Sequence, residues 1–298
     1  MHLFLTLISE QFSALILGGY DGSKDLMTAE LIPKRKNCAI PDLPIGIDGL
    51  SLLHTNDDKI MVCGGSNNVG TCLVLQHGQW KQDSYLFNRR HNATGISMPD
   101  AIYMIGQTYG KITWDWLSTG STTWYASEGV SDVFEFGCGV RLSEFEILLI
   151  GGYTTERRIL KINFLTGTSQ TVGHLHQGRY GHSCSLFQDT IFVTGGKYSS
   201  SIYLAHTEMI ELKTLTSRIG HDLKEARAFH GLAVSHVNKQ LRLLAIGGSF
   251  GEGAGKYRDS IEIWNPEGQS WNFFNEMKLS KGKSRFGCLS VPTHLICK

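Results

Sequence analysis

The sequence predicts an all-β protein folded as a six-bladed β-propeller, and three observations carry this prediction. Glycine pairs recur at a spacing of roughly 45 residues, which is the length of one propeller blade. Each pair follows a short apolar run that is rich in β-branched residues, as buried strands are. No segment shows helical periodicity. The pairs are Gly18-Gly19, Gly64-Gly65, Gly151-Gly152, Gly195-Gly196 and Gly247-Gly248, with Gly106-Gln107 between the second and third.

Four strands are expected in each unit. A segment of small residues precedes each apolar run and is predicted as the innermost strand, because blades crowd the axis of a propeller. A third strand carries a glutamate beside apolar residues, at Glu30, Glu208 and Glu262. A fourth strand begins with tryptophan after a polar turn, at Trp80, Trp124 and Trp271. Of the six innermost segments, four begin with an arginine: Arg90, Arg179, Arg227 and Arg285.

The glycine pairs have a structural explanation. The second strand of a blade must turn sharply into the third, and close packing between blades leaves little room for a Cβ atom. Glycine adopts positive φ at little steric cost. No pair lies in a dinucleotide-binding fingerprint or a P-loop, so phosphate binding at the pairs is not predicted.

The two ends of the chain are expected to meet in blade one. The chain enters near a second strand, Phe12 to Gly18, whereas Arg285 to Val291 reads as a first strand with nothing after it. Pairing of these segments would close the ring and leave no free sheet edge. Residues 2–8 are a rival for the inner position. We therefore predict an N-terminal segment, residues 1–11, and a single propeller over residues 12–298.

Composition excludes some function classes. The 298 residues carry a net charge of +1, which gives no overall field for nucleic acid. No apolar stretch approaches the roughly 20 residues that cross a bilayer, so no membrane insertion is predicted. The apolar N-terminus lacks a cationic start and makes a poor signal peptide. A monomeric propeller is expected.

The order of these markers resembles the kelch repeat: arginine, small residues, apolar run, glycine pair, glutamate, polar turn and tryptophan. Blades five and six, from Arg179 and Arg227, match best, and blades three and four are degraded. The resemblance implies a propeller of four-stranded kelch blades. It also implies a non-catalytic interaction scaffold or adaptor. No cofactor is expected, and because no Cys-x-x-Cys or His-Glu-x-x-His motif occurs, no metal site is predicted.

In kelch domains, the face that carries the second-to-third loops often binds a short, frequently acidic peptide. A protein or peptide partner is accordingly expected on this face. The expected contacts are aromatic residues, which dominate interface energetics, and the four arginines, whose forks suit carboxylates. The alternative, left open, is that the arginines pin blades together through backbone carbonyls. The expected contact residues are Tyr20, Tyr153, Tyr198, Phe250, Arg90, Arg179, Arg227 and Arg285.

Seven cysteines and twelve histidines raise further questions. Cys63 and Cys72 face each other across one predicted hairpin, and a disulfide there would indicate an oxidising compartment. Free buried thiols are the alternative, so localisation stays open between cytoplasmic and secreted. Cys138 and Cys288 are expected at the histidine position of the inner strand. His182 and His230 occupy that position in adjacent blades, and we interpret them as repeat residues rather than metal ligands.

Enzymes remain as alternatives. Kelch propellers include copper-radical oxidases, which join a tyrosine to a cysteine beside copper-binding histidines. Those enzymes are much longer, and no residue of this chain is assigned to their ligand set. A glycan-processing propeller or a secreted glycan-recognition propeller is the other alternative. No catalytic residue is predicted.

Overall fold

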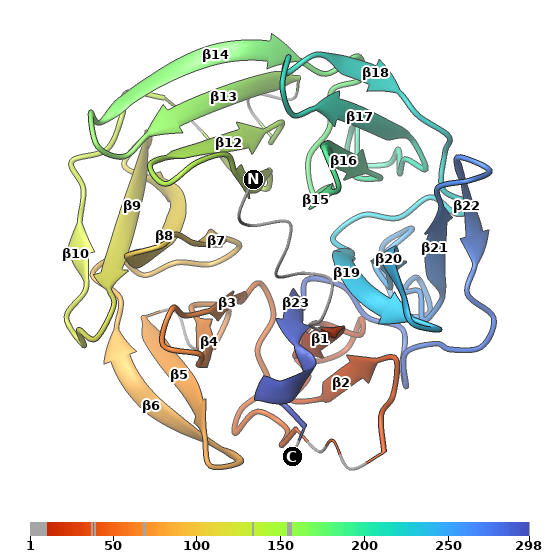
Figure 1. Cartoon of the computed structure of the whole chain (residues 1–298), viewed down its shortest axis with the longest axis horizontal. Coiled ribbons are helices and arrows are strands. Elements are labelled where there is room, and N and C mark those ends of the chain that lie inside the picture. Colours follow the sequence, from red (N-terminus) through yellow and green to blue (C-terminus); the bar gives the residue numbers. More distant parts are fainter. Residues whose placement is uncertain are drawn as a thin grey trace.

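The chain forms a ring of six antiparallel sheets, as the computed structural model shows (Figure 1). The structure describes residues 11–36, 38, 40–67, 70–132, 134–153 and 157–297. Five blades have four strands each, and blade one has three among the described residues. The predicted six-bladed propeller is therefore confirmed. The predicted segment 1–11 and the rival strand over residues 2–8 lie almost entirely outside the described residues.

The blades follow one another along the chain. Blade one holds β1 (Phe12–Leu17), β2 (Ala29–Ile32) and β23 (Gly287–Pro292). Blade two holds β3 (Ser51–His54), β4 (Ile60–Cys63), β5 (Thr71–Gln76) and β6 (Gln79–Tyr85). Blade three holds β7 (Thr94–Ser97), β8 (Ala101–Thr108), β9 (Lys111–Ser118) and β10 (Tyr125–Ala126).

Blade four holds β11 (Cys138–Arg141), β12 (Glu146–Ile150), β13 (Arg158–Asn163) and β14 (Thr168–His174). Blade five holds β15 (Ser183–Phe187), β16 (Thr190–Thr194), β17 (Thr207–Glu211) and β18 (Ser217–Ile219). Blade six holds β19 (Gly231–Val237), β20 (Gln240–Ile246), β21 (Ile261–Asn265) and β22 (Ser270–Phe273). A single 3-10 turn, η2 (Thr293–Leu295), follows β23.

The C-terminal strand closes the ring. β23 pairs antiparallel with β1 over its whole length, from Phe12 opposite Pro292 to Leu17 opposite Gly287. The innermost strand of blade one therefore comes from the far end of the chain, as the sequence predicts. In Figure 1 the blue β23 lies beside the red β1 and β2.

The core lies between the blades. Among the described residues, six apolar clusters fill the six junctions between neighbouring sheets. The junction of blades five and six, for example, packs Phe192 against Trp264 and Trp271 in edge-to-face contacts. Both faces of each sheet are covered, which explains why the second strands read as continuous apolar runs.

In five of the six blades a glycine pair turns the second strand into the next segment at positive φ, whereas in blade three β8 continues through Gly106 and Gln107. Gly195 and Gly196 have φ of 61° and 97°, and a Cβ atom on Gly195 would lie 2.3 Å from the Arg227 carbonyl oxygen. That carbonyl belongs to the next blade, so the pair is required both by backbone conformation and by blade packing.

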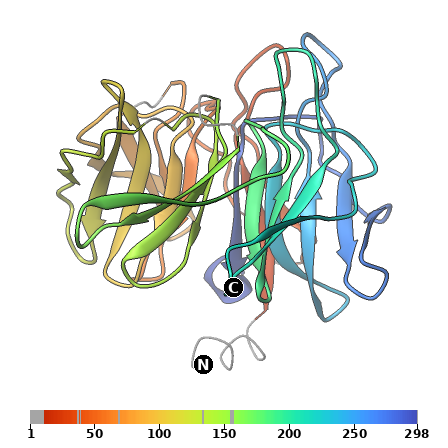
Figure 2. The same ribbon diagram turned by 90° about the horizontal axis from the view of Figure 1, so that it is seen from above.

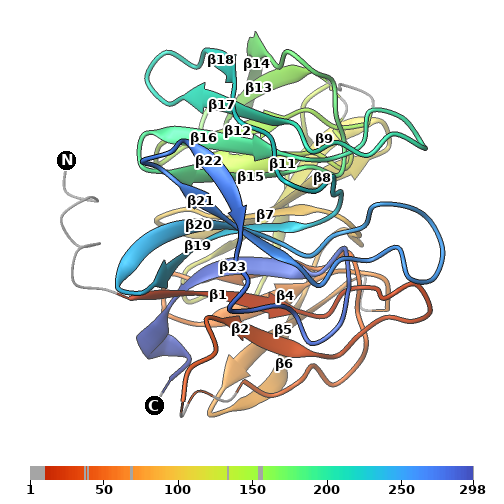
Figure 3. The same cartoon turned by 90° about the vertical axis from the view of Figure 1, so that its right-hand side faces the viewer.

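The second-to-third loops lie on one face of the ring, which we call the loop face. The loops of blades one, five and six, each more than ten residues long, rise above those of blades two to four (Figure 2). The C-terminus lies at the opposite face (Figure 3). Among the described residues, no helix is long and apolar enough to span a membrane.

Candidate interaction face and central channel

Arg179 is fully buried within blade five. Its guanidinium donates to the Glu208 carboxylate at 2.7 Å and to the carbonyls of Gly195 and His206 at 3.1 and 2.8 Å. Glu208 also accepts from the backbone N–H groups of His176 and Gln177. Burial opposes ionisation of Glu208, but these hydrogen bonds and the charge of Arg179 hold its pKa below the ordinary value. The Arg179–Glu208 ion pair therefore links the glycine turn of blade five to its third strand.

Equivalent buried pairs occur in three other blades. Arg227 bonds Glu262 at 2.6 Å, Arg90 bonds Asp115 at 2.9 Å, and Lys283 bonds Glu30 at 2.8 Å. In blades two and four the cation position holds Ile47 or Phe134, and the carboxylate position holds Leu73 or Leu160. The two positions therefore change together, from charged pair to apolar pair.

These contacts correct the sequence-based assignment of the arginines. Arg90, Arg179 and Arg227 are buried and ion-paired inside their own blades, so they are not exposed on a partner surface. The alternative, that the arginines pin blades together through backbone carbonyls, holds only in part: Arg179 and Arg227 do bond backbone carbonyls, but those of their own blades. Arg285 is not their counterpart: the ladder of β23 and β1 places Lys283 at that position and Arg285 two residues later.

Arg285 instead belongs to a ring of six residues at the channel mouth, each just before an inner strand. All six have positive φ, between 52° and 62°, and five backbone N–H···O=C bonds of 2.6–2.9 Å join one blade to the next. The Phe229 N–H, for example, donates to the Gly181 carbonyl at 2.6 Å. We call this set the mouth ring. It consists of Gly49, Asn92, Phe136, Gly181, Phe229 and Arg285.

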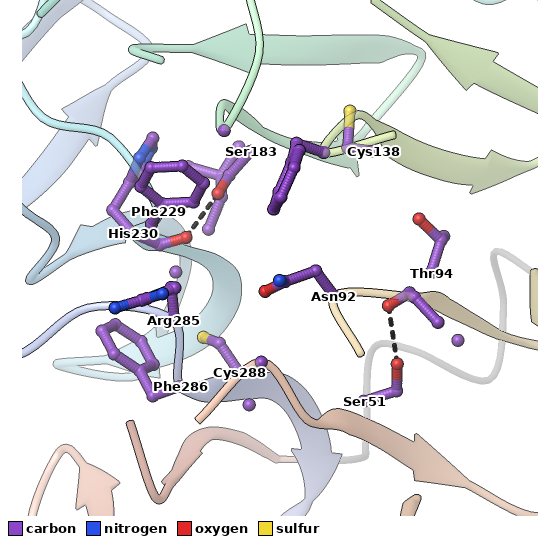
Figure 4. Close-up of a pocket in the computed structure, with 18 of the residues that line it drawn as sticks. Ser51, Asn92, Thr94, Cys138, Ser183, Phe229, His230, Arg285, Phe286 and Cys288 are labelled. Carbon is purple, nitrogen blue, oxygen red and sulfur yellow. Dashed lines mark hydrogen bonds between the residues drawn. The ribbon is translucent and has the colours of Figure 1, made fainter. Parts of the chain in front are cut away.

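Below the mouth ring lies a channel cavity of about 240 Å³, lined by the inner strands of all six blades. Hydroxyl groups join neighbouring blades along its wall: Ser51 donates to the Ala93 carbonyl, and Ser183 to the His230 carbonyl (Figure 4). Asn92 projects toward the middle of the channel in the same view. The cavity is small, polar and formed by every blade.

Arg285 is held by an acidic neighbour. Its Nε lies 3.0 Å from Asp48 Oδ2, and the His91 imidazole contacts the other carboxylate oxygen at 3.2 Å. Burial opposes ionisation of Asp48, but the His91 hydrogen bond and the Arg285 charge outweigh it and lower its pKa. The guanidinium also lies over the Tyr20 ring, 5.1 Å from its centroid. Its side chain remains about one-third exposed, at 32%.

The loop face of blades four to six carries paired aromatic and cationic groups. Tyr153 and Tyr180 meet edge to face at 5.0 Å, and Lys197 lies over both Tyr180 and Tyr203. Phe250 similarly lies beneath Arg258 at 4.2 Å. Among the predicted contacts, Tyr153 and Tyr198 are 55% and 48% exposed, whereas Tyr20 and Phe250 are partly buried.

The repeat histidines lie between blades. His230 Nε2 is 2.9 Å from the Thr194 hydroxyl of blade five. In blade four, Ile150 occupies the position of Thr194, so His182 lacks a hydroxyl partner there. Burial and the nearby Arg179 charge lower the pKa of His182 to about 3, and burial also lowers that of His230. Among the described residues, no three His, Cys, Asp or Glu side chains are grouped as metal ligands.

Six of the seven cysteines form disulfides. Cys63 bonds Cys72 within blade two, Cys38 bonds Cys297 beside the ring closure, and Cys138 bonds Cys184 across blades four and five. The ladders correct the predicted places of two cysteines: Cys138 lies one position beyond the histidine position, and Cys288 lies two beyond it. Cys288 is a free thiol, and burial raises its pKa to about 12.

Comparison with known proteins agrees with this geometry. The family model for the Kelch motif matches residues 232–278, which cover blade six from β19 to just beyond β22. The ring defines the class: this protein is a six-bladed β-propeller, and one of its blades matches the Kelch motif.

One similar solved structure is titled "Structure of YjhT". It superposes with a TM-score of 0.69 and 13% sequence identity, over 84% of this chain and 89% of that chain. At this identity the similarity concerns the fold alone. None of the curated proteins compared with the chain matches it significantly.

Proposed function

We propose that this propeller is a non-catalytic interaction module that binds a protein partner on the loop face. One observation carries the proposal: the exposed aromatic residues Tyr153 and Tyr198 stand on second-to-third loops of the loop face. Exposed aromatic side chains bury much area at little entropic cost when a partner covers them, and they are enriched among residues that dominate binding.

The placement of the candidate catalytic groups supports a non-catalytic role. His182 and His230 are buried between blades, with lowered pKa values that keep both imidazoles neutral at pH 7. The four buried cations are used in ion pairs within their own blades. The cations stabilise their own blades, and the two histidines are packed between blades.

The experiment places a photoreactive phenylalanine at Tyr153, at Tyr198 or at Phe145. Phe145 is a matched control, because it is 41% exposed and lies between β11 and β12 on the opposite face. Cross-linked adducts of one defined mass from the two loop-face positions, and not from Phe145, are expected. Equal labelling at all three positions, or labelling at Phe145 alone, would refute the assignment of the face.

We further propose that the protein works in an oxidising compartment, since three disulfides in one domain are rare where thiols are kept reduced. Alkylation of the denatured, unreduced protein should label one thiol, Cys288, as read by intact mass. Labelling of all seven cysteines in freshly isolated protein would contradict this proposal.

A further inference from the structure

The mouth ring contains side chains that are conformationally unfavourable where they stand. Gly49 and Gly181 show that glycine satisfies the ring, and glycine pays no steric cost at positive φ. Yet Asn92, Phe136, Phe229 and Arg285 occupy equivalent positions at φ of 54°, 54°, 52° and 52°. Bulky residues at positive φ are strained, and strained backbone of this kind is concentrated at ligand-binding sites. The retained side chains therefore point to a binding role.

Arg285 has an open pair of donors beside the channel mouth. Asp48 holds the Nε edge of the guanidinium, and its two terminal nitrogens have no partner among the described residues. Arg285 also lines the channel cavity. A planar guanidinium held on one edge and free on the other is suited to bidentate binding of a carboxylate.

Two aromatic rings of the mouth ring contact each other. Phe136 and Phe229 meet edge to face, with centroids 5.9 Å apart and planes at 81°. They come from blades four and six, and Gly181 of blade five lies between them. A Cβ atom on Gly181 would lie 2.7 Å from the Phe229 ring, so glycine at this position lets the ring cover blade five. The pair gives the mouth an aromatic wall.

The size of the cavity limits the occupant. At about 240 Å³ it is smaller than the roughly 300–1,000 Å³ of pockets that hold drug-sized ligands. One aromatic side chain with its carboxylate fits, whereas a folded segment does not. The hydroxyls, amide and carbonyls of the wall suit the remaining polar atoms of a single residue.

We propose that the channel mouth binds an aromatic ring and a carboxylate carried on one residue, the chemistry of an aromatic residue at the free C-terminus of a partner protein. Arg285 pairs with the carboxylate, and Phe136 and Phe229 contact the ring. This assignment rests on the proposed function, since it names the group that the loop-face partner inserts. A free aromatic carboxylic acid carries the same chemistry and is the other source to be tested.

The test uses fluorescence anisotropy of a labelled octapeptide that ends in phenylalanine. The free-acid peptide should bind, and its C-terminal amide should bind about tenfold more weakly or worse, because a charge-assisted pair is lost. Phe229→Gly and Arg285→Gln should weaken the free-acid peptide similarly, and Arg285→Gln should leave the amide unchanged. Equal affinities for acid and amide, or no effect of either variant, would overturn the proposal.

Phe229→Gly is chosen because glycine at φ 52° relieves strain, so the variant should fold at least as stably. Gln188→Gly is the matched control: Gln188 has φ 56° and lies in the β15–β16 turn, so binding should not change. N-acetylphenylalanine is the second arm. If N-acetylphenylalanine competes with an affinity equal to that of the peptide, the site is confirmed. The same result would overturn the assignment of a protein C-terminus as the source of the ligand.

The two proposals fail separately. Cross-linking through Tyr153 and Tyr198 with no peptide binding at the mouth would overturn only the assignment of the channel. Peptide binding without loop-face cross-links would confirm the channel site and contradict the wider partner surface.

Discussion

Replacing one member of the Arg179–Glu208 pair should destabilise the protein strongly. Both side chains are fully buried, with Nη2 and Oε1 2.7 Å apart. Arg179→Ile leaves a buried carboxylate without its cation, and the carbonyls of Gly195 and His206 without this donor. Loss of one partner of a buried pair costs about 3–5 kcal/mol, and we expect about 4 kcal/mol here.

Blade two shows how both members can be replaced together. Its apolar residues at these positions, Ile47 and Leu73, suggest the double variant Arg179→Ile with Glu208→Leu. Its free energy of unfolding should fall by about 2 kcal/mol less than the sum of the single losses, because no buried charge is left unpaired. Blade two also has Pro44 where blade five has a donating His176 N–H, so recovery should be partial.

Urea unfolding with the disulfides intact, followed by tryptophan fluorescence, measures this cycle. The control is Lys278→Ala, which breaks an exposed pair with Asp259 at 3.4 Å and should change stability by less than about 1 kcal/mol. Single losses below about 1 kcal/mol, or strict additivity in the double variant, would refute the reasoning.

Three further outcomes follow. Gly195→Ala should lower the free energy of unfolding by about 3 kcal/mol or more, because the new Cβ atom would lie 2.3 Å from the Arg227 carbonyl oxygen. Gly167→Ala, at φ 64° with open space around it, should lower it by only about 1 kcal/mol, and urea unfolding measures both. The pKa of His182, lowered from 6.5 to about 3, makes the unfolded chain bind a proton that the folded chain does not. Stability should therefore fall as pH drops below 6.5, by about 1.4 kcal/mol per pH unit from this residue, and His182→Gln should flatten the pH profile. Removing Cys38–Cys297, whose sequence separation is 259, should lower the free energy of unfolding by about 5 kcal/mol, against about 3 kcal/mol for Cys63–Cys72, whose separation is 9. Equal losses would count against the loop-entropy account.

The periodic glycine pairs predicted blade number and ring closure because both depend on local rules. A strand that ends on two glycines must turn, and a lone inner strand at the C-terminus must pair with the only incomplete blade. The structural position of each arginine depends instead on strand register. Aligning Arg285 with Arg179 by residue type misplaced it by two positions, and only the ladder with β1 identified Lys283 as the counterpart.

The disulfide between blades and the mouth ring could not be predicted by pattern. A shift of one residue along an inner strand changes which blade a side chain faces, so the pairing of Cys138 with Cys184 needs the exact register. The left-handed conformation of Phe136 and Phe229 leaves no mark on composition or periodicity. The one available signal was glycine at Gly49 and Gly181, in the same place relative to the inner strand.

The pairing of β23 with β1 has a consequence for synthesis of the protein. β1 ends at Leu17 and β23 begins at Gly287, so blade one lacks its innermost strand while the chain between them is synthesised. At roughly 5–20 residues per second, this delay lasts on the order of tens of seconds. Blades two to six can form during that time, and β1 presents an unpaired edge until β23 has emerged. A nascent chain stalled before Gly287 should therefore be more sensitive to proteolysis at blade one than at blade three.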